Sequence, residues 1–242
     1  MGRRAAVICA RGGSKGLPGK NLAEIQGHPL LGWSILQAHA CGLFDDILVS
    51  SDDDRILEVA GRYGNCHLVH RPAALASDTA SKLPAIVHAV ESVLGSRAGQ
   101  LQSLVDLDTT AIARSVDDIR GAVRLREERN CTSVITGCPS RRSPYFNMVE
   151  ADSSGAIRVV KESGSGFVRR QDAPATYDMN AAVYVWDAAA FLTDPRIFYP
   201  DTAIYVMPQE RSLDVDSSGD LDLLTWLIEQ RGLNPLAEGD GA

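Results

Sequence analysis

The sequence predicts an α/β protein in which helices cover both faces of a mostly parallel β-sheet. Short β-rich runs alternate with segments of helical periodicity from the N-terminus to about residue 138, and such alternation is typical of a parallel sheet. Residues 5–10 form a continuous apolar run, as expected of a central strand buried on both faces. The alternation breaks between about residues 139 and 177, where an inserted β-hairpin arm is expected.

The elements before the break follow from periodicity and from helix-start signals. Apolar residues recur at helical spacing from Leu83 to Leu94, after three residues able to cap a helix, Ser77, Asp78 and Thr79. The same criteria place the other segments. The expected strands are residues 5–10, 46–51 and 101–107, and the expected helices are residues 30–40, 54–63, 83–94 and 116–126.

The core resumes after the break with expected strands at residues 181–186 and 203–206, and it closes with a helix at residues 221–230. The inserted segment is rich in Ser, Gly, Pro and Arg and carries apolar residues expected to be exposed, Tyr145, Phe146 and Phe167. Exposed apolar clusters commonly mark interfaces. We therefore expect a single domain over residues 1–242 with an inserted dimerisation arm over about residues 139–177.

Composition excludes several classes of protein. The chain has 242 residues, is 45% hydrophobic and 23% charged, and has a net charge of −7. This acidic balance disfavours binding to nucleic acid or to an anionic membrane. The five cysteines show no CxxC spacing, so neither a disulfide framework nor a zinc site is expected. With no signal peptide and no apolar run near ~20 residues, we expect a cytoplasmic location.

A loop directly after the first strand carries the sharpest functional signal. Residues 11–21, RGGSKGLPGKN, hold four glycines together with Arg11, Lys15 and Lys20. Glycines let the backbone approach a ligand and direct its amides inward, and the cations add positive charge. Phosphates need both features. Because the spacing matches neither a Walker motif nor GxGxxG, the loop predicts phosphate binding of another type.

Two aspartates near the C-terminus are candidate metal ligands. Asp214 and Asp216 are two residues apart after a β-like run, a spacing that directs both side chains to one face of an extended backbone. Carboxylates that hold Mg²⁺ can bridge it to phosphate oxygens. The alternative is a pair of solvated acids in a turn before the last helix.

Taken together, ARGGSKGLPGKN and four later segments closely resemble the CMP-sialic acid synthetases, also called acylneuraminate cytidylyltransferases. The resemblance spans roughly residues 4–231. The later segments are residues 71–78 (RPAALASD), 107–114, 177–186 (YDMNAAVYVW) and 212–216 (SLDVD). It implies a Rossmann-like nucleotidyltransferase fold, a homodimer, and Mg²⁺-dependent attack of the sugar acid's anomeric hydroxyl on the α-phosphate of CTP.

The resemblance also implies residue roles. Arg11, Lys15 and Lys20 would act on the triphosphate, and Asp214 and Asp216 would bind the metal. Residues expected near the nucleotide are Gly12, Gly13, Ser14, Asn21, Arg71, Ser77 and Asp78. Residues expected near the sugar acid are Asp108, Thr110, Arg114, Arg170, Gln171 and Asn180, with Arg170 and Gln171 reaching a partner subunit from the arm. A solvated hairpin edge is the alternative for the arginine pairs of the arm.

One segment departs from the family pattern. The usual Gln-Pro-Thr-Ser-Pro-Leu-Arg is replaced by residues 108–114, DTTAIAR, which lack both prolines and carry Asp in place of Gln. Loss of proline is expected to free the loop backbone. An ionised Asp only accepts hydrogen bonds, so Asp108 would favour a sugar bearing an additional amide N–H. Residues 142–150 resemble the arm segment of the legionaminic branch, and residues 177–180 carry Asp where some neuraminate enzymes carry Arg. Together, these resemblances imply a legionaminic-type acid rather than N-acetylneuraminic acid.

Two other functions remain open at the level of sequence. A related cytidylyltransferase for a shorter acid such as Kdo usually carries Arg-Leu-Pro or Arg-Phe-Pro in place of Lys15 to Pro18. A nucleotide-binding module without catalysis is favoured by the altered loop and disfavoured by Lys20, Arg71 and Asp216. Pyrophosphate release from CTP with a panel of sugars separates these functions from the sialic-acid type.

Overall fold

A seven-stranded sheet forms the centre of the computed structural model, which describes residues 2–14, 16–77, 79–162, 167 and 169–237. The strand order is β11-β7-β10-β6-β1-β4-β5. Every neighbouring pair is parallel except the two that involve β10, which runs antiparallel to β6 and β7. The predicted α/β fold with a mostly parallel sheet is therefore confirmed. The strands of this sheet are β1 (Arg3–Cys9), β4 (Asp46–Ser51), β5 (His67–His70), β6 (Leu101–Leu107), β7 (Ser133–Pro139), β10 (Tyr177–Asp187) and β11 (Ala203–Val206).

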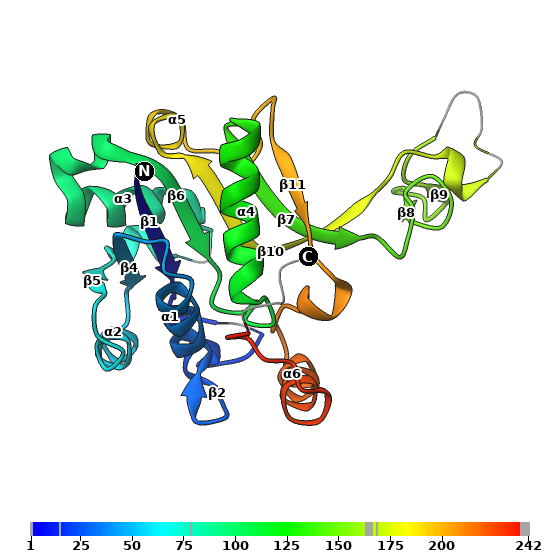
Figure 1. Cartoon of the computed structure of the whole chain (residues 1–242). Helices are drawn as coiled ribbons and strands as arrows, with labels where there is room; N and C mark the ends of the chain where they lie inside the picture. The colour runs from blue at the N-terminus through cyan, green and yellow to red at the C-terminus, as the bar shows by residue number, and fades with distance from the viewer. Residues whose placement is uncertain (1, 15, 78, 163–166, 168, 238–242) are drawn as a thin grey trace.

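Helices cover both faces of the sheet (Figure 1). Helices α1, α2 and α4 pack through one apolar cluster, and α3 and α5 pack through a second cluster on the opposite face. Helix α6 joins a third cluster with Leu30, Ile112 and Val215. The bounds are α1 (Leu30–Ala40), α2 (Asp54–Gly61), α3 (Lys82–Leu94), α4 (Val116–Arg129), α5 (Ala188–Thr193) and α6 (Ser218–Arg231). Short 3-10 turns are η1 (Lys20–Leu22), η2 (Ala73–Leu75), η3 (Gly95–Gln100), η4 (Arg170–Asp172) and η5 (Gln209–Arg211).

Several boundaries differ from the prediction for local reasons. Helix α3 is capped by Ser81, whose hydroxyl accepts from the amide of Leu83, and not by residues 77–79. Helix α6 begins earlier than predicted because Ser217 and Asp220 form a capping box. Strands β5 and β7 were not predicted. Strand β5 has only one buried residue, Val69, so it lacks the apolar pattern of a core strand.

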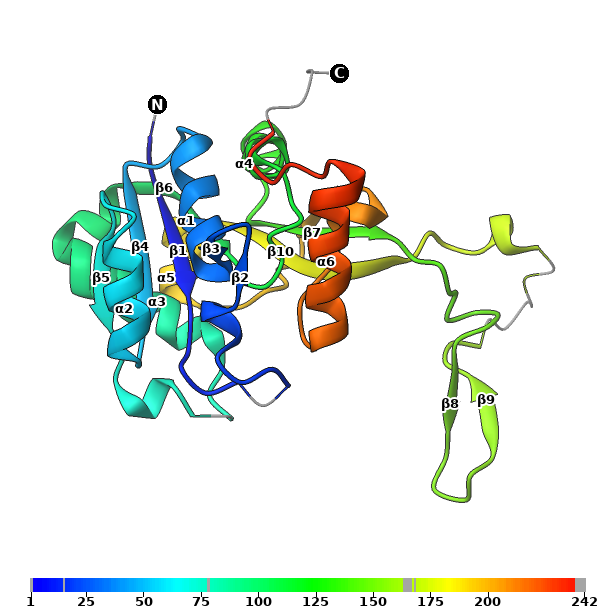
Figure 2. The ribbon, with the colours of Figure 1, turned by 90° about the horizontal axis from the view of Figure 1, so that it is seen from below.

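The inserted segment forms an arm that projects away from the sheet (Figure 2). It leaves the core where β7 ends at Pro139, returns where β10 begins at Tyr177, and contains the hairpin of β8 (Val149–Ala151) and β9 (Ile157–Val159). A small second hairpin, β2 (Glu24–Ile25) with β3 (His28–Pro29), precedes α1. The predicted hairpin is thus present, whereas its role in dimerisation stays a prediction.

The exposed apolar residues of the arm are not the predicted ones. Tyr145 packs edge-on against Phe167, with ring centroids 5.3 Å apart, and both rings and Phe146 are half-buried. The exposed apolar side chains of the arm and its base are instead Met148, Val149, Ile157, Val160, Tyr177 and Met179. Within the described part of the chain, no helix has the length and apolar character needed to cross a membrane.

Candidate active site

The glycine-rich loop leaves β1 at the edge where the parallel strands β1, β4 and β6 all end. Two neighbouring loops hold it in place. The amide of Gly12 donates to Asp52 Oδ1 at 3.0 Å, and a Cβ at Gly12 would lie 2.9 Å from that of Asp53. Asn21 donates to the carbonyl of Arg11 at 2.9 Å and accepts from Thr109 Oγ1 at 2.6 Å. A bulkier residue at position 12 would therefore displace the loop from β4.

The outer part of this loop is open to a ligand. A Cβ added at Gly13 or Gly19 would meet no atom within 4 Å, and Ser14 is half-buried. Gly19 has φ of 70°, the left-handed conformation that glycine adopts without strain. Backbone amides and cations at the end of a parallel strand are suited to phosphate groups. Lys15 lies outside the described residues.

Lys20 joins this loop to the predicted metal-binding acids. Its ammonium lies 2.8 Å from Asp216 Oδ1; the lysine side chain is 15% exposed and that of Asp216 is 76% exposed. A Cβ at Gly16 would lie 2.5 Å from the carbonyl oxygen of Asp216. The structure therefore brings together the predicted triphosphate and metal residues, although they are 196 positions apart in the sequence.

Asp214 has a carboxylate that is suited to a cation. It is half-buried, and Asp214 Oδ1 has no hydrogen-bond partner among the described residues. Burial, with the negative charges of Asp108 and Asp216 nearby, raises the pKa of Asp214 despite a hydrogen bond from Thr110. Val215, between the two acids, is fully buried. Within the described part of the chain, no group of three or more His, Cys, Asp or Glu could hold a metal ion.

A cavity of about 280 Å³ lies beside the glycine-rich loop. Four of the predicted site residues line it together, namely Arg11, Arg71, Ser77 and Asp108. Arg71 is 4% exposed and is fixed by two hydrogen bonds to Ser50, from Nε to Oγ at 3.1 Å and from Nη2 to the carbonyl at 2.8 Å. The structure thus brings four of the predicted site residues into one cavity; Asp78 lies outside the described residues.

A three-charge cluster in this cavity was not predicted. Lys82 Nζ lies 2.6 Å from Asp106 Oδ2 and 2.9 Å from Asp108 Oδ2. Burial alone would lower the pKa of Lys82, but the two carboxylates outweigh it and raise the pKa. Burial raises the pKa of Asp106, which is 1% exposed. In the sequence, Asp106 could have predicted this cluster, because an acid inside a buried strand requires a counter-charge.

The loop at residues 108–114 lacks the two prolines of the family pattern and is held by side-chain hydrogen bonds. Asp108 Oδ1 accepts from the amide of Thr110 at 3.0 Å and from its hydroxyl at 2.7 Å. Arg114 Nη1 donates to the carbonyls of Asp108 at 2.7 Å and Ala182 at 3.0 Å. Gln37 donates to the carbonyls of Ile112 and Arg114. Side-chain hydrogen bonds replace the restraint that proline would impose.

These contacts change the interpretation of Asp108 and Arg114. Both carboxylate oxygens of Asp108 already accept bonds, from Thr110 and from Lys82. Burial would raise the pKa of Asp108, but Lys82 and the bonds from Thr110 hold it well below its usual range. Arg114 is fully buried and has no surface to offer a sugar acid, so it positions the loop. Thr110 is 7% exposed.

The remaining predicted sugar residues divide between the core and the arm. Asn180 is 8% exposed; it accepts from Thr136 Oγ1 at 2.7 Å and donates to Ser212 Oγ at 2.9 Å. It therefore links the sheet to the segment carrying Asp214 and Asp216. Gln171 lies in the η4 turn of the arm and lines a separate cavity with Pro139 and Tyr177. The side chain of Arg170 lies outside the described part.

A phosphate-suited loop, a cationic cavity and an acid pair at the carboxyl edge of a parallel sheet define a nucleotide-binding α/β protein. Comparison with known proteins gives the family. The family model described as Cytidylyltransferase matches residues 5–185. This chain belongs to the cytidylyltransferase family.

The curated relatives cover almost the whole chain. CMP-N,N'-diacetyllegionaminic acid synthase of Campylobacter jejuni is 37% identical over 235 residues, which span 97% of this chain and 99% of that protein. Post-translational flagellin modification protein B of Campylobacter coli is 36% identical over 233 residues, or 96% and 98% of the two chains. The N-acylneuraminate cytidylyltransferase of Streptococcus agalactiae is 29% identical over 216 residues, which cover 88% of this chain and 50% of that protein.

The fold is shared with solved structures of lower identity. The structure described as CMP:2-keto-3-deoxy-manno-octonic acid synthetase complexed with CTP has a TM-score of 0.67 and 15% identity, and covers 95% of this chain and 99% of its own. This likeness confirms the nucleotidyltransferase-like fold.

Proposed function

We propose that the protein couples a nine-carbon, sialic-acid-like sugar acid to CMP, using CTP and releasing pyrophosphate. The observation that carries the proposal is the Lys20–Asp216 ion pair, which joins the cationic glycine-rich loop to the candidate metal acids. The cavity lined by Arg11 and Arg71 lies beside the same glycine-rich loop and is suited to the nucleotide. One relative that covers nearly the full chain, the CMP-N,N'-diacetyllegionaminic acid synthase, bears the name of this activity.

In the proposed reaction, the anomeric hydroxyl oxygen of the sugar acid forms a bond to the α-phosphorus of CTP. The bond from that phosphorus to the oxygen bridging to the β-phosphate breaks, pyrophosphate leaves, and the hydroxyl proton is released. Such displacements depend on charge neutralisation and alignment more than on covalent help from the protein. Arg11 and Lys20, with Lys15 by family resemblance, would neutralise the triphosphate, and amides near Gly12 and Gly13 would orient it.

Asp214 and Asp216 would hold Mg²⁺, which stabilises negative charge on the phosphate oxygens when it is bound. The unpartnered oxygen of Asp214 and the exposed carboxylate of Asp216 support this role. Asp216→Asn retains the shape and removes one charge. We expect the Mg²⁺ concentration for half-maximal activity to rise about tenfold or more, measured as initial rate against total metal. A titration curve that matches the wild type would rule out Asp216 as a ligand; Asp222→Asn, in α6, is the matched control.

We further propose a diacylated sugar of the legionaminic type as the preferred substrate. The support is the 37% identity to the diacetyllegionaminic acid synthase. Asp108 is hydrogen-bonded to Thr110 and Lys82, so we propose that it shapes the loop and does not contact the sugar. The surrounding groups and the arm would then distinguish the two sugar acids. Competition between N,N'-diacetyllegionaminic and N-acetylneuraminic acids at equal concentration, with CTP and Mg²⁺, is the test. We expect at least a tenfold higher kcat/KM for the diacetylated acid, and a higher value for N-acetylneuraminic acid would overturn this assignment.

The arm supports a homodimer in which Arg170 and Gln171 of one protomer reach the sugar site of the other. Within one chain, Gln171 lies in the arm and lines a cavity that shares no lining residue with the nucleotide cavity. We therefore propose that Gln171 binds the sugar from a second copy of the chain. Because CTP is a cytoplasmic metabolite, the proposed reaction also implies a cytoplasmic location.

A further inference from the structure

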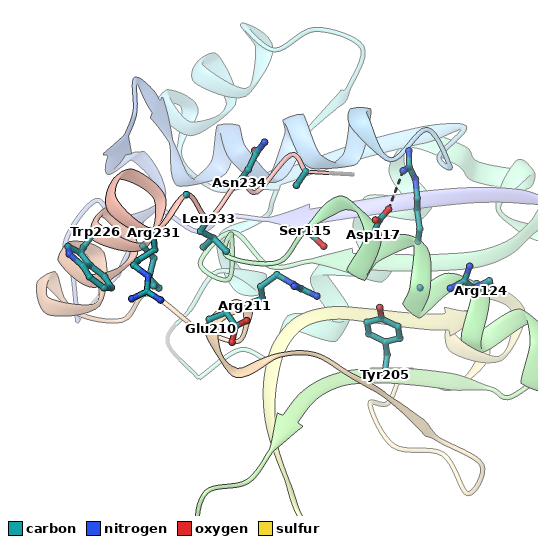
Figure 3. A pocket seen from close by; sticks show the side chains of 15 residues that line it. Ser115, Asp117, Arg124, Tyr205, Glu210, Arg211, Trp226, Arg231, Leu233 and Asn234 are labelled. Atoms are coloured by element: carbon teal, nitrogen blue, oxygen red, sulfur yellow. Dashed lines mark hydrogen bonds and ion pairs between the residues drawn. The ribbon is translucent and has the colours of Figure 1, made fainter. Parts of the chain in front are cut away.

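A second and larger cavity, of about 1090 Å³, lies between α4, β11, the η5 turn and the end of α6 (Figure 3). None of the residues that line it also lines the nucleotide cavity. Its charged lining residues are Arg120, Arg124, Arg211 and Arg231, with Asp117 and Glu210. The four guanidinium groups offer hydrogen-bond donors to an anion, and Arg211, Arg120 and Arg124 also lie within 4.0 Å of Asp118, Asp117 and Glu128.

Two of these arginines are fixed in the cavity wall. Arg211 donates to both carboxylate oxygens of Asp118, at 2.8 and 3.1 Å. Arg120 donates to the carbonyls of Cys41 and Ala40, both at 3.1 Å. Their guanidinium groups are therefore held in place before any ligand arrives, which lowers the entropic cost of binding.

The other two arginines are exposed and can adjust to a ligand. The side chain of Arg124 is 73% exposed and only approaches Glu128, at 4.0 Å. The guanidinium of Arg231 lies 5.7 Å from the ring centroid of Trp226, which is itself 46% exposed. In Figure 3, Trp226 and Arg231 lie on the α6 side of the cavity, and Arg124 and Tyr205 lie across from them. The cavity thus combines phosphate-binding donors with a planar surface suited to stacking a base.

The cavity wall is connected to two segments of the proposed catalytic site. Asp118, which binds Arg211, also accepts from the amide and hydroxyl of Ser115, the residue that follows the 108–114 loop. On the other side, Arg211 precedes Ser212, which Asn180 binds at 2.9 Å, and leads to Asp214. A ligand on Arg211 therefore contacts a segment shared with the metal acids and with the substrate loop.

We propose that this cavity is a regulatory site for a nucleotide. The base would stack beside Trp226 and Arg231, and the phosphates would bind the arginines of η5 and α4. Glu210 and Asn234 at the rim can bond ribose hydroxyls. The volume exceeds what one nucleotide requires, so the site would also admit a bound water layer. Occupancy would change turnover through the Arg211–Asp118–Ser115 connection.

The test uses ADP, whose purine base a cytidylyl site is not expected to accept. Trp226 is the exposed tryptophan; Trp33 and Trp186 are 6% and 1% exposed. We expect ADP to quench tryptophan fluorescence saturably and to change the rate of pyrophosphate release. In R124A/R231A the ADP affinity should fall about tenfold or more, and the effect on rate should disappear. R62A/R97A, which removes two exposed arginines elsewhere, is the charge-matched control and should bind like the wild type.

The fluorescence titration requires no turnover, so its result is independent of the proposed catalytic function. Repeating it in K20A, which alters the glycine-rich loop, should leave ADP affinity unchanged. Three results would overturn the inference: no saturable quenching in the wild type, equal affinity in R124A/R231A, or binding without an effect on rate. Tighter binding of inorganic pyrophosphate than of ADP at this cavity would contradict the role given to the base.

Discussion

Lys82 lines the cavity beside the glycine-rich loop, where its charge balances two neighbouring acids. It lies within ion-pair distance of Asp106 and Asp108, and Asp106 is nearly inaccessible to water. Removing one member of a buried ion pair leaves the other charge uncompensated. The free-energy cost of that unpaired charge is larger than the net stabilisation that the pair provides. The cluster therefore couples the stability of β6 to the geometry of the 108–114 loop.

Lys82→Met is expected to lower the free energy of unfolding at pH 7 by roughly 3–5 kcal/mol. The loss should shrink in acid. Because the folded pKa of Asp108 lies below its ordinary value of 3.8, ionised Asp108 stabilises the fold above about that pH, and this stabilisation disappears as the pH falls through the folded pKa. Denaturant titrations of both proteins between pH 3 and 7 are the measurement, with K82M/D106L as the control that restores part of the stability. An equal loss at every pH would contradict the ion cluster.

The side chains of Arg114 and Asp108 show the limit of prediction at the residue scale. Family resemblance implies that both residues lie near the sugar, and both belong to the loop at residues 108–114. Arg114 nevertheless donates to backbone carbonyls, and Asp108 accepts from Thr110. A sequence reports which residues share a loop. The direction of this guanidinium depends on the Ala182 carbonyl of β10 and the Ser34 hydroxyl of α1, which no local pattern specifies.

At the scale of elements, the arm exposes apolar side chains that a partner subunit would cover. It projects from the core (Figure 2), and Val149 and Ile157 on its hairpin are 55% and 64% exposed. Exposed apolar side chains on a projecting hairpin are costly in water unless a partner covers them.

We expect a dimer at micromolar concentration, measured by sedimentation velocity. V149K/I157K should shift the population to monomer without changing the melting temperature of the core by more than a few degrees, because these side chains contribute no core packing. L223K, at an exposed apolar site on α6, tests whether the effect belongs to the arm. A monomeric wild type, or a dimer that is unaffected by the arm variant, would show that the arm has another role.

Most elements were predictable because their signals are local. Helix α1 and strands β4, β6 and β11 have the predicted bounds, since apolar periodicity and flanking polar residues define them. Strand β7 was missed although it is apolar, since it directly precedes the arm and its partner β10 lies beyond the insertion. Its pairing is a long-range contact, which periodicity does not report.

At the scale of the whole molecule, the site is assembled where parallel strands end together. Lys20 and Asp216 are distant in sequence and form an ion pair, because the fold returns the C-terminal segment to the glycine-rich loop. The sequence predicted this meeting only through family resemblance. The larger cavity beside α4 had no sequence signal, since its arginines come from three separate elements.

The most direct test is ³¹P NMR of the purified protein with CTP, Mg²⁺ and N,N'-diacetyllegionaminic acid. We expect the CTP signals to be replaced by those of pyrophosphate and one new phosphodiester, only when the sugar acid is present. K20A should slow this conversion by about 100-fold or more, since electrostatic stabilisation is commonly the largest catalytic contribution, whereas the surface variant R97A should match the wild type. Unchanged CTP with every nine-carbon acid supplied, or pyrophosphate release that does not require a sugar acid, would contradict the account.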